Sequence, residues 1–272
     1  MDHPVFSLKN VWFSYLGKFP ALAAIDIDIA AGQKISIIGA NGSGKSTLLH
    51  MLDGLIFADR GMVSFSGQEL NEQRFSNAEF SRDFRRKVGF VFQNPDVQLF
   101  CPTVKEDIVF GPLQLGLAKN EIQKRLEKLI TILGIQDLLD RSPSQLSIGE
   151  KRKVALASTL IIGPDTLILD EPTAGLDPAT TRHIIDLLID ENATGKTIIT
   201  STHDLHIVGE VSDIVYVFGS DKKIVKFGQP LDILNDTALL TANNLMHIHS
   251  HRHKDGVHVH PHVHLDHHKE EH

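Results

Sequence analysis

Residues 39–46 read G-A-N-G-S-G-K-S and fit the pattern G-x-x-x-x-G-K-[ST], whose backbone surrounds the phosphates of a nucleotide. The pattern needs a strand before it and a helix after it, and the apolar run 34–38 and the segment 46–52 provide them. Glycines let the backbone approach phosphate oxygens, and a helix N-terminus adds positive potential. The sequence therefore predicts a phosphate-binding loop that contains Gly39, Asn41, Gly42, Ser43, Gly44, Lys45, Ser46 and Thr47.

Three side chains of this loop have separate tasks. Lys45 is expected to reach the β- and γ-phosphates as a point charge, Ser46 to place its hydroxyl on Mg²⁺, and Thr47 to contact an adjacent phosphate. Kinases, GTPases, motors and transport ATPases share such a loop. The loop alone therefore predicts nucleotide binding and leaves the reaction open.

A second group of residues, 166–172 with the sequence T-L-I-L-D-E-P, is an apolar strand that ends in two carboxylates. Asp170 at the strand end can hold Mg²⁺ through water. Glu171 follows at the edge of the sheet, where it can act as general base on an attacking water within hydrogen-bond reach. Together with the phosphate loop, this pair predicts hydrolysis of a nucleotide.

The elements that position these residues alternate between strands and helices. Strands are expected at 5–9, 24–29, 34–38, 88–92, 166–170, 197–200 and 214–218. Helices are expected at 46–52, from Asn120 as N-cap to Gly134, after Ser147, and at 178–191, with a helical insertion over 95–163. This alternation predicts an α/β fold with a mostly parallel sheet covered on both faces.

Composition limits the alternatives. The chain has 272 residues, a net charge of −7 and one cysteine, Cys101, so it forms no intrachain disulfide and no cysteine metal cluster. A negative balance argues against nucleic acid as a partner. The start has no signal-peptide pattern, and no apolar run reaches the length of a membrane span. We expect a cytosolic chain that serves any membrane process as a peripheral subunit.

The order of the motifs resembles an ATP-binding-cassette (ABC) nucleotide-binding subunit over about residues 5–228. The resemblance implies a P-loop NTPase with a RecA-like sheet, an N-terminal antiparallel β part and an inserted helical subdomain. It implies that Tyr15 stacks on adenine, with Trp12 and Phe13 as rivals, and that Gln93 contacts Mg²⁺ and the attacking water. It also implies that His203 contacts the γ-phosphate and orients the water.

Residues 146–150, L-S-I-G-E, resemble the family signature L-S-G-G-Q but have Ile148 and Glu150 at two positions. In the family this segment completes the nucleotide site of a second ATPase subunit, so Ser147 and Gly149 are expected to bind the partner's ATP. Asp177 resembles the loop residue that crosses this dimer interface. Whether the dimer has two identical or two different chains stays open.

Residues 93–112 resemble the corresponding segment of energy-coupling-factor importers of vitamins and of cobalt or nickel. The resemblance implies that this segment faces a transmembrane coupling protein, at the cytoplasmic face of the membrane, while another membrane subunit captures the substrate. We divide the chain into an ATPase domain at 1–240 and a histidine-rich tail at 241–272.

Eleven of the 16 histidines fall in the last 26 residues. Their alternate spacing would place them on one face of an extended chain, and Asp255-Gly256 is a favoured hairpin turn. That turn predicts the pairs His253–His258, His251–His260, His249–His262 and His247–His264. A disordered polar tail is the other reading. In either form imidazoles suit Ni²⁺, Co²⁺, Zn²⁺ and Cu²⁺, and the resemblance to importers narrows these to nickel or cobalt.

Nickel or cobalt import is therefore the leading functional hypothesis. Two rivals remain: vitamin import with an incidental metal-binding tail, and a soluble ABC regulator whose tail senses or stores metal.

Overall fold

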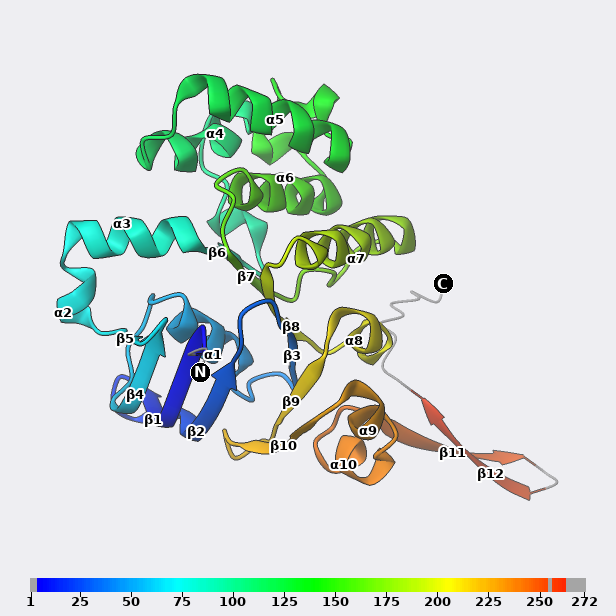
Figure 1. The fold of residues 1–272 in the computed structure, drawn as a ribbon. Coiled ribbons are helices and arrows are strands. Elements are labelled where there is room, and N and C mark those ends of the chain that lie inside the picture. The colour runs from blue at the N-terminus through cyan, green and yellow to red at the C-terminus, as the bar shows by residue number, and fades with distance from the viewer. Residues whose placement is uncertain (1–3, 254–255, 263–272) are drawn as a thin grey trace.

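A six-stranded sheet carries the phosphate loop in the computed structural model, which describes residues 4–253 and 256–262 (Figure 1). The strand order is β10-β9-β3-β8-β7-β6. The five strands from β9 to β6 are parallel, and β10 pairs antiparallel with β9 at one edge. This arrangement confirms the predicted mostly parallel sheet, with bounds β3 Lys34–Gly39, β6 Val88–Val91, β7 Thr166–Asp170, β8 Thr197–Thr202, β9 Ile214–Phe218 and β10 Ile224–Gly228.

The central strands are apolar on both sides because both faces of the sheet are covered. On β3, Ile37 joins the core shared with helix α1 (Lys45–Leu52), whereas Ile38 joins the core beneath helix α8 (Leu205–Val211). On β7, Leu167 packs with helix α7 (Pro178–Ala193), and Ile168 points to the α1 side. Every residue of β7 and of β8 is buried.

The N-terminal part is a separate antiparallel sheet in the order β2-β1-β4-β5. Its strands are β1 Phe6–Tyr15, β2 Phe19–Ile29, β4 Arg60–Phe65 and β5 Gln68–Glu69. Phe6 pairs with Ile29 on one side and Phe65 on the other, and all three are buried. This inner face packs with α1, so the phosphate loop lies between the two sheets (Figure 1).

The helical part follows β6 and forms the upper layer of Figure 1. Helices α2 (Glu72–Phe75) and α3 (Ala78–Lys87) precede β6, and α4 (Val104–Gln114), α5 (Lys119–Leu133) and α6 (Ile148–Leu160) follow it. The predicted cap at Asn120 is wrong: α5 begins at Lys119 with Ala118 as N-cap, because Ala118 already has the extended backbone that an N-cap requires. Gly134 ends the helix with φ 64°, as predicted.

After β10, helices α9 (Pro230–Leu234) and α10 (Thr237–Ala242) close the core under β9. Leu240, Leu245 and Met246 belong to this core. Among the described residues, no helix is both long enough and apolar enough to cross a bilayer.

The tail forms a two-stranded ladder of β11 (His247–His253) and β12 (Gly256–His262). The predicted register is wrong by two residues, since His253 pairs with Gly256 and His251 with His258. An Asp-Gly pair is only a local preference, and two registers that differ by two residues satisfy the same alternating pattern. Histidine therefore still opposes histidine, at His249–His260 and His247–His262. The tail side chains, and His264 altogether, lie outside the described residues.

Candidate nucleotide-hydrolysis site

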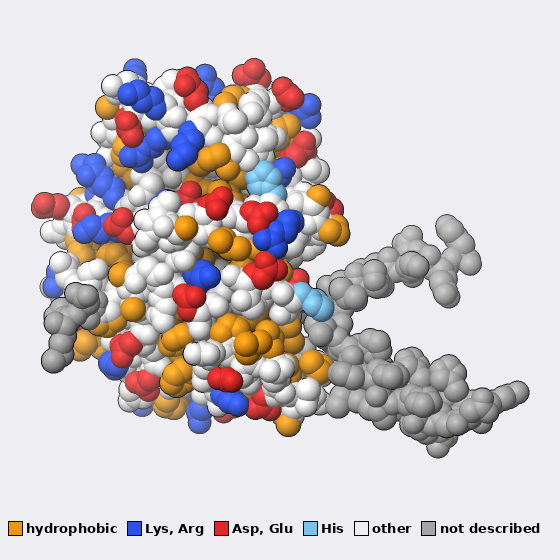
Figure 2. Space-filling model, turned by 45° about the vertical axis from the view of Figure 1, so that its right-hand side comes forward, with side chains coloured by type: hydrophobic (Ala, Val, Ile, Leu, Met, Phe, Trp, Pro, Cys, Tyr) orange, Lys and Arg blue, Asp and Glu red, His pale blue; other side chains and the backbone are white. Residues whose placement is uncertain are grey.

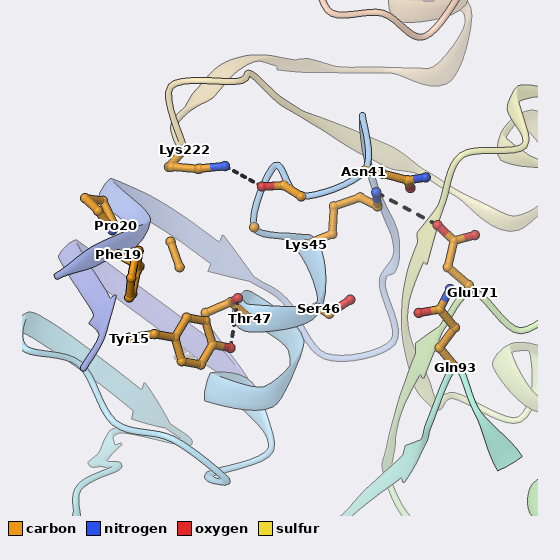
Figure 3. A pocket seen from close by; sticks show the side chains of 13 residues that line it. Tyr15, Phe19, Pro20, Asn41, Lys45, Ser46, Thr47, Gln93, Glu171 and Lys222 are labelled. Carbon is orange, nitrogen blue, oxygen red and sulfur yellow. Dashed lines mark hydrogen bonds and ion pairs between the residues drawn. The ribbon is translucent and has the colours of Figure 1, made fainter. Parts of the chain in front are cut away.

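A pocket of about 480 Å³ lies over the phosphate loop (Figure 3). Residues from both sheets line it, so it is formed where the N-terminal sheet meets the six-stranded sheet. Its lining contains most of the predicted loop residues together with one aromatic and two polar candidates: Asn41, Gly42, Gly44, Lys45, Ser46, Thr47, Tyr15, Gln93 and Glu171. Gly39 and Ser43 are buried behind this lining, at the end of β3 and within the loop.

The loop follows a path that requires glycine at Gly44. This residue has φ 117°, and a Cβ built there would lie 2.4 Å from the carbonyl oxygen of Ala21 on β2. Such a contact is impossible, so a side chain would push the loop away from the N-terminal sheet. The close approach of loop and sheet is what forms the pocket.

The Lys45 ammonium group lies at the centre of the site. It donates hydrogen bonds to the carbonyl oxygens of Gly39 at 2.7 Å and Ala40 at 3.3 Å, and it is 3.9 Å from the Glu171 carboxylate. Burial lowers the pKa of Lys45, and the negative charges of Glu171 and Asp170 partly offset this effect. A buried cation among carbonyls and carboxylates is well placed to bind phosphate oxygens.

Of the three aromatic candidates for adenine stacking, Tyr15 is the one that lines the pocket. Its hydroxyl is 3.2 Å from the Thr47 hydroxyl (Figure 3). Phe13 packs edge-on against Tyr15, with the ring centres 5.0 Å apart, and Trp12 donates its indole N–H to Asn10. Phe19 also lines the pocket, and its ring is exposed.

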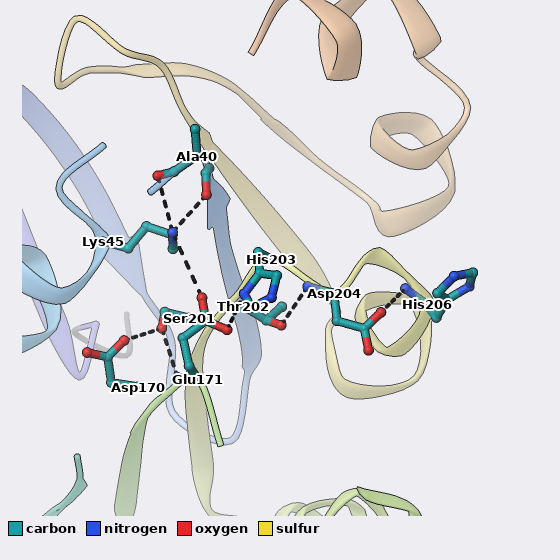
Figure 4. Close-up of polar contacts among 10 residues, drawn as sticks. Ala40, Lys45, Asp170, Glu171, Ser201, Thr202, His203, Asp204 and His206 are labelled. Carbon is teal, nitrogen blue, oxygen red and sulfur yellow. Dashed lines mark hydrogen bonds and ion pairs between the residues drawn. The ribbon is translucent and has the colours of Figure 1, made fainter. Parts of the chain in front are cut away.

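The two carboxylates lie at the end of β7, beside β8 (Figure 4). Asp170 accepts a hydrogen bond from the Ser201 hydroxyl at 2.5 Å. The backbone N–H of Glu171 donates to the same hydroxyl at 3.1 Å, and Glu171 has φ 49°. The Glu171 carboxylate is 2.8 Å from His203 Nδ1, so the predicted base and histidine contact each other.

The residues expected to hold Mg²⁺ offer the donors that this ion prefers. Ser46 and Gln93 line the same pocket, and the buried carboxylate of Asp170 follows on β7. Hydroxyl, amide and carboxylate oxygens are hard ligands, which Mg²⁺ takes together with water and phosphate oxygens. The donor set therefore fits the ion.

The signature segment, which was expected to bind the ATP of a second subunit, does not line this pocket. Ser147 is the N-cap of α6, and its hydroxyl donates to the Glu150 carboxylate at 2.8 Å and accepts from the Glu150 N–H at 3.3 Å. Asp177 caps α7 by accepting from the Thr180 N–H at 2.9 Å. Gly149 lies beside Thr180, so signature segment and Asp177 loop are neighbours.

Glu150 departs from the family pattern with a physical consequence. The Ser147 backbone N–H and hydroxyl lower the pKa of the Glu150 carboxyl, which therefore stays ionised at neutral pH. The Ser147 hydroxyl was expected to bind the partner's ATP, and in this structure it donates its hydrogen bond to the Glu150 carboxylate. Ile148 beside it is 48% exposed.

Two polar residues of the site were not predicted. Ser201 donates a hydrogen bond to the Asp170 carboxylate and accepts one from the Glu171 backbone N–H, and the sequence feature that marks it is a hydroxyl within the fully buried strand β8. Lys222 lines the pocket and donates a hydrogen bond to the carbonyl oxygen of Gly42. It lies 180 residues from Gly42 in the sequence, and no local pattern marks it.

Comparisons with known proteins agree with this geometry. Residues 22–174 match the family described as ABC transporter. The chain is 46% identical over 246 residues to the nickel import ATP-binding protein NikO of Rhodobacter capsulatus, which covers 89% of this chain and 96% of that protein. It is 40% identical over 241 residues to the energy-coupling factor transporter ATP-binding protein EcfA of Methanocaldococcus jannaschii, with 89% and 85% covered.

A solved structure has the same fold. It is cbiO1 of Clostridium perfringens, described as part of the ABC transporter complex cbiONQ, and it matches with a TM-score of 0.75 and 33% identity over 89% of this chain and 95% of that one. The phosphate loop, the two carboxylates and the fold thus point to one assignment. The chain belongs to the ABC transporter family, as an ATP-binding subunit of the energy-coupling-factor type that hydrolyses ATP to power transport.

Proposed function

We propose that this ATPase powers the import of nickel or cobalt through membrane partner subunits, at the cytoplasmic face of the membrane. The observation that carries the proposal is the histidine ladder at the end of the chain, in which three pairs of histidines are directly opposed. Imidazole is a preferred ligand of both metals. The 46% identity to a nickel import ATP-binding protein supports the same cargo.

In the proposed reaction Glu171 is the general base and His203 orients the attacking water. The 2.8 Å contact between them supports these roles, since it holds the carboxylate in one position. Gln93 contacts the water and Mg²⁺, and Ser46 and Asp170 hold the ion. Tyr15 stacks on adenine, and Gly39, Asn41, Gly42, Ser43, Gly44, Lys45 and Thr47 bind the phosphates.

A second ATPase subunit, identical or different, completes the site in this proposal. Ser147 and Gly149 bind the ATP of the partner, and Asp177 crosses the interface. The support is geometric: the signature segment is outside the pocket of its own chain, and Ile148 beside it is exposed. These features leave the segment accessible to the nucleotide of a second subunit.

The transmembrane coupling protein is proposed to dock on the groove between α3, β6, α4 and α6. This groove has a volume of about 340 Å³, and its mainly apolar wall includes Val88, Phe90, Leu115 and Ile162. Phe110 directly precedes Gly111, which lines the groove, and it packs edge-on against Phe100 with ring centres 5.0 Å apart; both rings are exposed. Exposed aromatic side chains beside an apolar groove are typical of a protein-binding surface.

In this proposal the chain divides into an ATPase domain at 1–240 and a tail at 241–272. The tail binds Ni²⁺ or Co²⁺ as a local reservoir or sensor. Its candidate ligands are His247, His249, His251, His253, His258, His260, His262 and His264. Calorimetry at pH 7.5 tests this proposal, with a chain ending at Met246 as the control. Binding tighter than millimolar that the shortened chain lacks would support it, and equal binding by both chains would contradict it.

Two other functions make different predictions. A vitamin importer would bind metal at the tail incidentally, and a soluble ABC regulator would use the tail to sense or store metal. Nucleic acid is not a proposed partner, because the net charge is −7 and the face in Figure 2 intersperses basic with acidic side chains.

The test is uptake by vesicles that contain the copurified membrane partners. We expect ATP-dependent accumulation of Ni²⁺ or Co²⁺, and none with the Glu171→Gln chain. Uptake of a vitamin instead would contradict the metal cargo, and a chain that copurifies with no membrane subunit would favour the soluble regulator.

A further inference from the structure

Lys222 reaches the phosphate loop because of the sheet topology. Strands β3 and β9 are parallel neighbours, and Gly39 at the end of β3 pairs with Phe218 at the end of β9. The two ends are so close that a Cβ at Gly39 would lie 2.9 Å from the Cβ of Phe218. The turn that follows β9 therefore begins beside the phosphate loop.

The turn between β9 and β10 is held in place from two sides. The carbonyl oxygen of Lys222 accepts a hydrogen bond at 3.0 Å from the N–H of Ala23 on β2. Its side chain donates to the carbonyl oxygen of Gly42 (Figure 3). Lys222 has φ 67°, in the left-handed region. Backbone and side chain thus fix Lys222 between the N-terminal sheet and the loop.

The charge of Lys222 faces the nucleotide pocket. The residue lines this pocket, as Lys45 does. Lys45 is 3.9 Å from Glu171, whereas no carboxylate lies within ion-pair distance of Lys222 among the residues at 4–246. An ammonium group has three donors, and the Gly42 carbonyl takes one. Two donors of an uncompensated cation are therefore available where a polyanion binds.

We propose that Lys222 is a second phosphate-binding cation, which donates to a phosphate oxygen of the nucleotide from the β9–β10 turn. The proposal rests on the ATP site and is independent of the transported cargo. Two cations in one pocket, Lys45 from the phosphate loop and Lys222 from the β9–β10 turn, would neutralise more of the triphosphate charge than Lys45 alone. Binding would also tie the turn and the N-terminal sheet to the nucleotide.

The test compares Lys222→Gln, Lys222→Arg and Lys223→Gln in the full chain. Lys223 is the next residue and is exposed, so it is a matched control for charge and position. Dissociation constants for ATP, pyrophosphate and adenosine are measured by competition with a fluorescent ATP analogue. A charge-assisted hydrogen bond of this kind corresponds to about a 10-fold change in affinity.

We expect Lys222→Gln to weaken the binding of ATP and of pyrophosphate about 10-fold. The binding of adenosine should not change, and the salt dependence of ATP binding should be reduced. Lys222→Arg should keep most of the affinity, and Lys223→Gln all of it. Unchanged pyrophosphate binding would overturn the proposal. If Lys222→Gln weakened adenosine binding as much as ATP binding, or if Lys222→Arg bound ATP as weakly as Lys222→Gln, Lys222 would have a structural role only. The wild type and Lys223→Gln show whether the chain binds ATP at all. A failure of the nucleotide site is therefore distinguished from a failure of the Lys222 proposal.

Discussion

Glu171 and His203 are joined by a 2.8 Å contact between Oε2 and Nδ1, each just past the end of its strand, β7 and β8 respectively. These strands are parallel neighbours, with Asp170 paired to Ser201, so two central strands of the sheet set the contact. Lys45 lies 3.9 Å from the other carboxylate oxygen. The base is therefore held between a cation on the phosphate loop and an imidazole.

His203→Ala is expected to lower kcat for ATP hydrolysis by about 100-fold, because the base loses the group that orients it and the water. The dissociation constant for ATP should change less than threefold, roughly 0.6 kcal/mol. Phosphate release and nucleotide binding check the two effects. His206→Ala is the control, since this histidine is nearby and exposed. Equal losses in both variants would remove the specific role of His203.

Glu150→Gln tests the departure in the signature segment. Glutamine can keep the capping box with Ser147, so the stability of α6 should not change. If the signature segment meets the partner's ATP as proposed, a carboxylate about 4 Å from a phosphate would repel it by roughly 1 kcal/mol in water, and its removal would raise the affinity about fivefold. ATP-dependent dimerisation should therefore need about fivefold less ATP, as measured by light scattering. Tighter binding of ATP to the monomer alone would contradict the partner-site assignment.

Asp53 tests the effect of a buried carboxyl on stability. Burial raises its pKa from 3.8 to about 6, and Arg85 at 2.8 Å opposes this rise. Because the folded state holds the proton more tightly, ionisation destabilises the fold as pH rises from about 4 to 6. We expect the stability of the wild type relative to Asp53→Asn to fall by up to roughly 3 kcal/mol over that window and to stay constant above it. Denaturant titrations between pH 4 and 8 check this, and a wild-type stability that rises with pH relative to that of Asp53→Asn would contradict it.

Residues whose function depends on neighbours in the sequence could be predicted. The phosphate loop is one such segment, because strand, glycines and helix follow one another in residues 34–52. Asp170 and Glu171 are another such pair, because they come at the end of the apolar strand that begins at Thr166. Tyr15 could be named but not separated from Trp12 and Phe13, since an alternating strand does not say which ring meets a loop far along the chain.

Features set by the pairing of distant segments could not be predicted. Lys222 reaches Gly42 only because β9 lies beside β3 in the sheet. Helix α3 was missed because its sequence A-E-F-S-R-D-F-R-R-K is mostly charged, and Phe84 is its one buried residue. The register of the histidine ladder was predicted wrongly because an alternating pattern is equally satisfied by pairings two residues apart.

The most direct test of the account is phosphate release by Glu171→Gln in the full chain, measured together with ATP binding. Glu127→Gln, an exposed position on α5, is the matched control. If Glu171 is the base of this transport ATPase, its variant will release phosphate at less than about 1% of the wild-type rate and bind ATP as tightly as the wild type. Wild-type turnover by Glu171→Gln would contradict the account.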